Sequence, residues 1–402
     1  MENKEGGAER PTILFFGNDW FADNRTSSHH LARQFSKYFR VFYVDSPGIR
    51  NMKGSKRDLI RMVKKVMRFL RGAEEVAPNL KVVTFLQVPL HGIPWVSRLN
   101  QVFLRLTARW LMWKEGIRDP IAWFHLPHMA TLLGTLGECL SVYYCTDDHQ
   151  AYPGVNAERI RQMDGLLCRN VDLLFCVSEP LLAKKRQFNP TAMLSPHGVD
   201  VHHFQLAQSP TTKIPEEISS ISAPIVGYFG LVGGWLALDL LKYLAEQRPQ
   251  WNFVLIGRVT DPERTPTAKN LHFLGSRPYS ELPRYGKAFS VAIIPYAFES
   301  DWTYYANPLK LKEYLALGKP VVATSTPEID KYADVVEIAK SPEEFLQAID
   351  KVLSREDTEQ RIQTRLSKVS SQSWEARAEL LKQTLLARIS QSPERVTSRI
   401  RR

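Results

Sequence analysis

Short apolar runs alternate with longer helical patterns along most of this 402-residue chain, and this alternation constrains the fold more than any other feature. Twelve of the runs have the length and the residue types of buried strands. They lie at 12–17, 41–45, 81–85, 121–127, 141–147, 173–178, 192–198, 224–230, 252–258, 271–275, 291–296 and 320–325. Strands that alternate with helical patterns are typical of parallel sheets covered by helices. We therefore expect an α/β fold.

A polar stretch rich in Ser, Thr and Pro interrupts the alternation at 205–223. We expect it to link two doubly wound, Rossmann-like domains, residues 1–204 and 224–370. Residues 371–402 would add a C-terminal helix and a basic tail. In sheets of this kind ligands bind beyond the carboxyl ends of the strands. The expected binding site is therefore a cleft between the two domains.

The formal net charge of +11 favours an anionic partner, and a nucleotide, a nucleic acid or a membrane surface would qualify. Nucleic acid is disfavoured, because the aromatic residues lie mostly in apolar runs and no familiar nucleic-acid motif is present. No window of about eighteen residues is continuously apolar, and the polar first residues lack an apolar signal region. We expect a cytoplasmic protein without a spanning helix.

The cysteines indicate neither a disulfide framework nor a metal site. None of the four forms a C-x-x-C pair, and each lies in or near an apolar run. We expect reduced core thiols at Cys139, Cys145, Cys168 and Cys176.

The stretch ANPLKLKEYLALGKPVVATST, residues 306–326, predicts a helix followed by a buried strand. Asn307 would be the N-cap, Pro308 the first helical residue, and Gly318 the end of the helix. Lys310 and Lys312 would then lie near the positive end of the helix dipole, where a cation costs up to about 1 kcal/mol. An anion bound at this helix end would explain their position.

Glu313 lies almost one helical turn after Lys310, on the same face. Together they suit a nucleotide, with the lysine on a diphosphate and the carboxylate accepting hydrogen bonds from ribose hydroxyls. The alternative is a solvated Lys–Glu face worth only a few tenths of a kcal/mol.

Two strand-end loops in the second half also suit an anionic ligand. The sequence GYFGLVGGW places Gly230, Gly233 and Gly234 after a strand, where glycine lets a backbone approach a phosphate closely. It is not the dinucleotide fingerprint G-x-G-x-x-G, and glycine-rich turns of this kind are common. The next loop, at Gly275–Arg277, offers a guanidinium for phosphate or base, or simply an exposed loop residue.

These segments resemble the GT-B glycosyltransferases. PLKLKEYLALGKPVVAT is similar to their nucleotide-binding signature, in the form Pro-x-Lys-x-x-Glu-Tyr-x-Ala-x-Gly-Lys-Pro-Val-Val found in bacterial polysaccharide-assembly enzymes, the teichuronic-acid type among them. LSPHGVDVHHF (194–204) resembles the segment before their interdomain linker, and FLGSRPYSELPRYGKAFSVAIIPY resembles a further stretch that these enzymes share. The resemblance covers most of 190–330 and is looser over 10–150. It implies that the C-terminal segment 371–402 returns to the N-terminal domain.

The resemblance implies a nucleotide-sugar donor, with a UDP-sugar as the expected class. Lys310 would contact the diphosphate, Glu313 the ribose, and the loop Gly275–Arg277 would face the base; Asn307 is placed with them at the helix start. GT-B enzymes carry no obligatory metal, so neither a metal nor a cofactor is expected.

Many retaining members of this group place two glutamates eight positions apart. Here the first position holds Tyr305, and Glu299 or Asp301 would be the nearest substitutes. Whether the transfer retains or inverts the anomeric configuration therefore stays open. A non-catalytic subunit that only binds the nucleotide also remains possible.

Catalytic candidates lie in VYYCTDDHQAY, where an apolar strand ends in Asp147, Asp148 and His149. Acidic residues at such a strand end suit a general base. This segment also resembles a Tyr-x-x-x-Asp-Asp element in the acceptor domain of some bacterial glycosyltransferases, which implies Asp147 as the base. Helix N-capping by either aspartate is the alternative. His149 is a candidate substrate contact.

The first strand–loop–helix, GNDWFADNRTSSHHLARQF (17–35), offers Arg25, Ser28 and His29 as further substrate contacts. A serine N-cap and two partly buried histidines would explain the same pattern. His125 and His128, after another strand, are expected to be packing or loop residues.

Two basic amphipathic stretches, 51–72 and 97–114, complete the first half. The first holds eight basic residues against one acid, and the second adds arginine and tryptophan beside leucine. Such helices suit an anionic bilayer at the inner face of the cell membrane, where a lipid-linked acceptor would be found. The alternative is two ordinary core-facing helices with solvated charges.

The favoured interpretation is a cytoplasmic glycosyltransferase that moves a sugar from a nucleotide-sugar to a glycan or lipid-linked acceptor in cell-envelope or exopolysaccharide assembly. A sugar-nucleotide epimerase of the same fold is the alternative enzyme, and it would need no acceptor.

Overall fold

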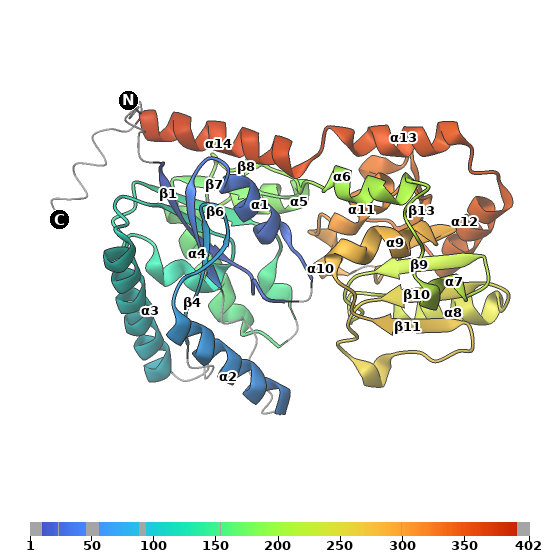
Figure 1. Cartoon of the computed structure of the whole chain (residues 1–402), viewed down its shortest axis with the longest axis horizontal. Helices are drawn as coiled ribbons and strands as arrows, with labels where there is room; N and C mark the ends of the chain where they lie inside the picture. The colour runs from blue at the N-terminus through green and yellow to red at the C-terminus, as the bar shows by residue number, and fades with distance from the viewer. Residues whose placement is uncertain are drawn as a thin grey trace, which may run out of the picture. The chain divides into compact units, whose positions relative to one another are not determined.

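The computed structural model describes residues 10–22, 24–45, 56–87, 94–152, 154–298 and 300–391. The chain forms two compact units, each built on one sheet (Figure 1). The first unit comprises the chain up to Cys176, Leu182–Leu194, and the chain from Ala378 onward. The second comprises Val177–Leu181 and Ser195–Arg377.

The sheet of the first unit has the strand order β3-β4-β2-β1-β5-β6-β7-β8. Neighbouring strands run parallel, except that β3 and β4 are antiparallel. The strands are β1 (Thr12–Gly17), β2 (Arg40–Asp45), β3 (Glu74–Ala77), β4 (Leu80–Thr84), β5 (Ile121–Phe124), β6 (Leu140–Cys145), β7 (Leu173–Cys176) and β8 (Met193–Leu194). The connecting helices are α1 (Ser27–Phe35), α2 (Lys56–Arg71), α3 (Pro94–Glu115), α4 (Ala157–Asn170) and α5 (Glu179–Arg186).

Stacked aromatic side chains fill the core of the first unit. The Trp123 ring lies 5.6 Å from the ring of Phe15 and 5.6 Å from that of Tyr144, all three fully buried. Since side chains alternate across a strand, every second residue of β1, β5 and β6 joins this layer. The outcome is a sheet buried on both faces, as the near-continuous apolar runs predict.

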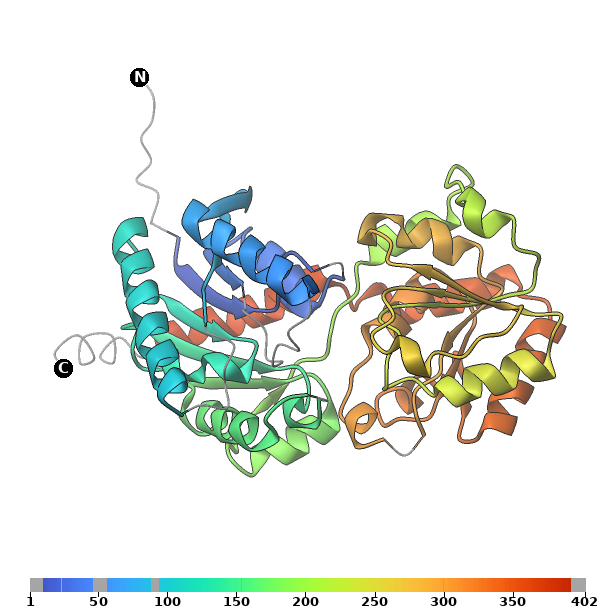
Figure 2. The same ribbon diagram turned by 90° about the horizontal axis from the view of Figure 1, so that it is seen from below.

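The sheet of the second unit is parallel throughout, in the order β11-β10-β9-β12-β13-β14. Helices cover both of its faces (Figure 2). The strands are β9 (Ile225–Phe229), β10 (Asn252–Ile256), β11 (Leu271–Gly275), β12 (Val291–Ile294), β13 (Val321–Thr324) and β14 (Val336–Ala339). The helices are α6 (Val201–Gln205), α7 (Glu216–Ser219), α8 (Leu238–Gln247), α9 (Leu282–Lys287), α10 (Asp301–Tyr304), α11 (Leu309–Ala316), α12 (Pro342–Ser354) and α13 (Glu359–Ser370). The last helix, α14 (Trp374–Ser390), begins in this unit and belongs to the first unit from Ala378 onward.

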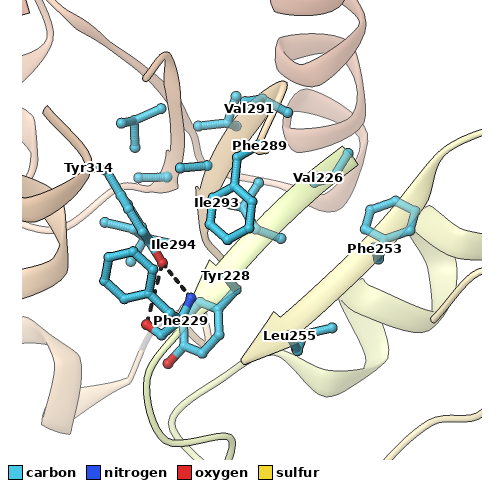
Figure 3. Close-up of a cluster of buried hydrophobic side chains, with 14 of the residues drawn as sticks. Val226, Tyr228, Phe229, Phe253, Leu255, Phe289, Val291, Ile293, Ile294 and Tyr314 are labelled. Carbon is cyan, nitrogen blue, oxygen red and sulfur yellow. Dashed lines mark hydrogen bonds between the residues drawn. The ribbon is translucent and has the colours of Figure 1, made fainter. Parts of the chain in front are cut away.

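A buried tyrosine joins helix α11 to the end of strand β9 (Figure 3). The backbone N–H of Phe229 donates to the Tyr314 hydroxyl at 2.8 Å, and both residues lie in the core cluster of this unit. The Phe229 and Tyr314 rings meet edge to face at 4.6 Å. This contact fixes α11 against the strand that leads into Gly230.

The expectation of two doubly wound, parallel-sheet domains is confirmed, and all twelve expected strands are present. Two strands were not anticipated. Both are four-residue edge strands, β3 with the sequence EEVA, of which half is glutamate, and β14 with the sequence VEIA. Edge strands carry a weak apolar signal because one side of the strand faces solvent or a loop.

The prediction that 205–223 is a linker is wrong. This segment continues from α6 through a short 3-10 turn into α7, and it belongs to the second unit. Two of its apolar residues, Ala207 and Ile218, are buried in the core cluster, with Phe204 just before them, whereas Leu206 and Ile214 are exposed. The polar composition of the segment gives no indication that Phe204, Ala207 and Ile218 pack into the core.

Candidate functional site

In the second unit, Lys310 reaches the glycine turn that follows β9. A Cβ placed on Gly230 would come within 3.1 Å of the Lys310 side chain, and Gly230 has a φ of +136° that favours glycine. The Lys310 Nζ lies 5.4 Å from the ring centroid of Tyr228 and 5.5 Å from that of Tyr296. The ammonium group is therefore held by two aromatic faces beside a backbone turn beyond the carboxyl end of β9.

Glu313 is a partly buried carboxyl group next to this lysine. Burial raises its pKa to about 7, and the charge of Lys310 opposes the rise. Asp200, which caps the start of α6, adds to it. Burying an ionisable carboxyl group costs free energy unless a ligand or a cation pairs with it, so such groups are often found at functional sites. Lys310 and Glu313 therefore form the core of the candidate site.

The helix start differs from the expectation in two respects. α11 begins at Leu309, Pro308 occupies the cap position, and Asn307 is not the N-cap. Its side-chain amide instead donates to the carbonyl oxygen of Val177 and to Glu328, both at 3.0 Å. Asn307 thus fastens the loop before α11, and its role in nucleotide binding stays a prediction.

Lys312 does not share the position of Lys310. Its side chain is 2% exposed, and its Nζ donates to the carbonyl oxygen of His197. Burial lowers its pKa to about 7. Two residues along a helix rotate a side chain by about 200°, so the two lysines face opposite ways. Of these two lysines, Lys310 is the one that remains available for an anion.

Two of the other residues expected to contact the nucleotide, Gly233 and Arg277, contact other residues of the second unit. The space beside Gly233 is filled by Thr260 and by the ring of Trp235, each within 2.7 Å of the point where a Cβ would stand, so this glycine allows a close internal contact. Arg277 pairs with Glu217 of α7, its Nε lying 2.8 Å from the carboxylate. Gly275 adopts a φ of +74° at the end of β11. Contact of these residues with a nucleotide stays a prediction.

In the first unit, Asp147 and Asp148 follow β6 and point to different partners. The Tyr152 hydroxyl donates to Asp147 at 2.6 Å. Asp148 is buried and forms an ion pair with Lys184, at 2.8 Å. The 3-10 turn after them begins without a side-chain cap bond from Asp148, so the N-capping interpretation of this residue is wrong.

His149 is buried behind these aspartates, and neither of its ring nitrogens has a hydrogen-bond partner among the described residues. Burial lowers its pKa to about 4, so it is neutral at physiological pH. Its ring meets that of Tyr152 edge to face at 5.4 Å. Direct substrate contact by His149 stays a prediction.

Both ring nitrogens of His29 are engaged within the chain. The Thr26 N–H donates to Nδ1 at 3.0 Å, and Nε2 donates to the Asp19 carbonyl at 3.1 Å. Burial lowers the pKa of His29 to about 4. The N-cap of α1 is Thr26 and not a serine, and it forms a capping box with His29. His29 thus holds the loop before α1 in place. Arg25 is exposed in that loop.

Asp45, a fully buried carboxyl group at the end of β2, is a candidate that the sequence motifs did not single out. Burial raises its pKa to about 7, and Lys65 of α2, 4.0 Å away, opposes this. The Trp20 N–H donates to it at 2.8 Å. The sequence does contain a signal for Asp45: the apolar run VFYVD ends in an aspartate, as the run SVYYCTD ends in Asp147. His125, by contrast, is buried and bonded to Ser27 at 2.9 Å, as expected of a packing residue.

The described residues hold no group of three or more His, Cys, Asp or Glu side chains arranged to bind a metal ion. None of the described helices combines the length and the apolar character needed to cross a bilayer. All four cysteines are free thiols, and three of them are buried.

The comparisons with known sequences point to glycosyltransferases. Residues 230–355 match the profile of the family described as glycosyl transferases group 1. The chain is also 27% identical over 229 residues to TuaH of Bacillus subtilis (strain 168), provisionally described as a teichuronic acid biosynthesis glycosyltransferase. That match covers 54% of this chain and 55% of TuaH, so the chain spans about half the length of this curated relative.

The comparisons with solved structures cover nearly the whole chain. A sucrose-phosphate synthase from Thermosynechococcus elongatus has a TM-score of 0.71 at 15% identity, over 95% of this chain and 100% of its own. HepE from Anabaena, solved with UDP and glucose, has a TM-score of 0.64 at 15% identity, over 93% and 98%. An E. coli structure bound with UDP-2-fluoro glucose has a TM-score of 0.64 at 13% identity, over the same shares.

These similarities confirm the resemblance drawn from the motifs and the GT-B fold that it implies. The family profile begins at Gly230 and includes Lys310 and Glu313. The region with the candidate anion site is thus the region that the family shares.

Proposed function

We propose that this protein is a glycosyltransferase that moves a sugar from a UDP-sugar to a glycan or lipid-linked acceptor in cell-envelope polysaccharide assembly. The observation that carries the proposal is the Lys310 ammonium beside Gly230, with the partly buried Glu313 one helical turn away. HepE was solved with UDP and glucose, and TuaH is connected with teichuronic acid biosynthesis. HepE supports a nucleotide-sugar donor, and TuaH supports a role in polysaccharide assembly.

Lys310 would stabilise the negative charge that builds up on the diphosphate as the bond to the sugar breaks. Glu313 would accept hydrogen bonds from the ribose hydroxyls, and Arg277 and Gly275 would lie at the base. No metal would be required, because the Lys310 ammonium group would supply the positive charge at the diphosphate.

Asp147 would act on the acceptor. As a general base it would take the proton of the acceptor hydroxyl while the oxygen attacks the sugar carbon. Tyr152 holds this carboxylate in place through the 2.6 Å hydrogen bond. Asp148 is committed to Lys184, so it would serve as a positioning residue.

Calorimetric titration with UDP, GDP and ADP, without metal, tests the donor site. We expect one nucleotide to bind selectively, and Lys310→Ala to weaken it about 10- to 100-fold, the value of a hydrogen bond to a charged group. Lys242→Ala, on the exposed face of α8, is the matched control and should bind as the wild type does. Equal binding by both variants would remove Lys310 from the site.

Product analysis separates transfer from epimerisation. Incubated with donor alone, a transferase leaves the sugar-nucleotide largely unchanged, whereas an epimerase converts it without an acceptor. Asp147→Asn should abolish transfer while leaving UDP affinity intact. Full transfer by this folded variant would contradict its role as the base.

A further inference from the structure

Two helices of the first unit carry most of the exposed large hydrophobic side chains among the described residues. Of twenty-two such residues, six lie on α2 and seven on α3. On α2 they are Ile60, Met62, Val63, Val66, Met67 and Leu70, the last 73% exposed. On α3 they include a stripe at spacings of three and four, namely Trp95, Leu99, Val102, Leu106, Trp110 and Trp113, the last 80% exposed. An exposed apolar area of this extent indicates a binding surface.

Helix α2 is attached to the unit by its polar side. The Lys65 Nζ lies 4.0 Å from Asp45, and the Arg68 guanidinium lies 3.6 Å from the ring centroid of Phe21. Phe69 meets Phe103 of α3 at 6.1 Å. At 100° per residue, the exposed stripe 60, 63, 67 and 70 lies on the opposite side of the helix. The apolar side therefore faces outward, and α2 is not an ordinary core-facing helix.

Helix α3 has two separate apolar sides. One packs into the core through Val96, Leu104, Ala108 and Leu111, which are buried. The other is the exposed stripe, flanked by the exposed Arg98, Arg105 and Arg109. Because the first side already attaches the helix, the second is not needed for packing within the unit.

The charge of the two helices identifies the partner. α2 and α3 contain eleven basic residues and two acids, Asp58 and Glu115, a formal charge of +9 out of the +11 of the whole chain. A second copy of this surface would be repelled by the like charge. An anionic bilayer attracts the basic residues and takes up the apolar stripe, and tryptophan is favoured at its interface.

We propose that the outward faces of α2 and α3 form a docking surface for an anionic lipid bilayer, on which the protein lies without spanning it. The proposal stands on this surface alone. One extension rests on the proposed function. Because α2 is attached to Asp45, the last residue of β2, and to Phe21, which follows β1, docking would hold the carboxyl edge of this sheet near the headgroups, where a lipid-linked acceptor is presented.

Co-sedimentation of the full chain with vesicles tests the proposal without reference to activity. We expect binding to phosphatidylcholine vesicles that contain phosphatidylglycerol, little binding to phosphatidylcholine alone, and weakening as salt is raised. The double variant Leu70→Gln and Trp113→Gln should lower the partition coefficient by about tenfold or more. Leu206→Gln and Leu380→Gln, equally polar changes at side chains 52% and 57% exposed elsewhere, should bind as the wild type does.

The charge is tested separately. Lys64→Gln with Arg71→Gln should weaken binding by about tenfold or more, since each basic residue near the surface contributes about 1 kcal/mol. Lys242→Gln with Lys269→Gln, which removes the same charge from the second unit, is the control. Absence of binding at low salt, or equal loss in the control variants, would overturn the proposal. A third result would also overturn it: no vesicle binding, together with a concentration-dependent dimer in sedimentation velocity that the Leu70/Trp113 double variant abolishes. That result would assign the surface to a second copy of the chain.

Discussion

The raised pKa of Glu313 makes nucleotide binding depend on pH in a way that can be calculated. With a pKa of about 7, this carboxyl group is mostly ionised at pH 8 and mostly protonated at pH 6. In the proposed site the carboxylate would accept a hydrogen bond from each ribose hydroxyl, whereas the protonated group has one of its two oxygens occupied by the proton. The ionised fraction falls about tenfold between these pH values, so the affinity for UDP should fall about tenfold because of Glu313.

The variant Glu313→Gln isolates this effect from the protonation of the nucleotide itself. At pH 8 it should bind UDP about 10- to 100-fold more weakly than the wild type, the loss of a hydrogen bond to a charged group. At pH 6 the difference should shrink by about tenfold, because the wild-type group is then protonated as well.

Isothermal titration calorimetry at both pH values measures the two affinities directly. Glu246→Gln, at an exposed position on α8, is the matched control. A wild-type-to-Gln ratio that does not change between pH 6 and pH 8 would refute the reasoning, as would wild-type affinity in the Gln variant at pH 8.

Three further predictions concern stability and are measured by denaturant unfolding. His149→Phe should make the free energy of unfolding less sensitive to acid. The pKa of His149 is about 4 in the folded protein and about 6.5 in the unfolded chain, so the unfolded chain takes up a proton first as the pH falls. In the wild type this lowers the free energy of unfolding by about 2 kcal/mol between pH 7.5 and pH 5, and the variant should lack this loss. A constant difference between variant and wild type would contradict this. Tyr314→Phe should cost about 1–3 kcal/mol, because it leaves the buried N–H at the end of β9 without its 2.8 Å partner. Ile218→Ala should cost about 2–5 kcal/mol, since this side chain is fully buried; a cost near zero, as at the exposed Ile214, would restore 205–223 as a linker.

Most of the scaffold could be predicted from the sequence because its signals are local. A strand buried on both faces must be apolar along its length, so each central strand is visible as a short run between polar segments. The position of Lys310 at a helix start after a strand could be predicted in the same way. Gly318 ends α11 with a φ of +73°, as its residue type predicts.

The sequence by itself determined which residues are available to the site, whereas the tertiary structure decided which of them reach it. Lys310 and Lys312 are alike in sequence, but the carbonyl of His197, more than a hundred residues away, takes one of them. The apolar stripe of α2 has the period of a core-facing helix, and the contacts of Lys65, Arg68 and Phe69 on the opposite side turn it outward. Which side of a helix is buried depends on residues that are distant in the chain, and the local pattern of apolar and polar residues does not specify them.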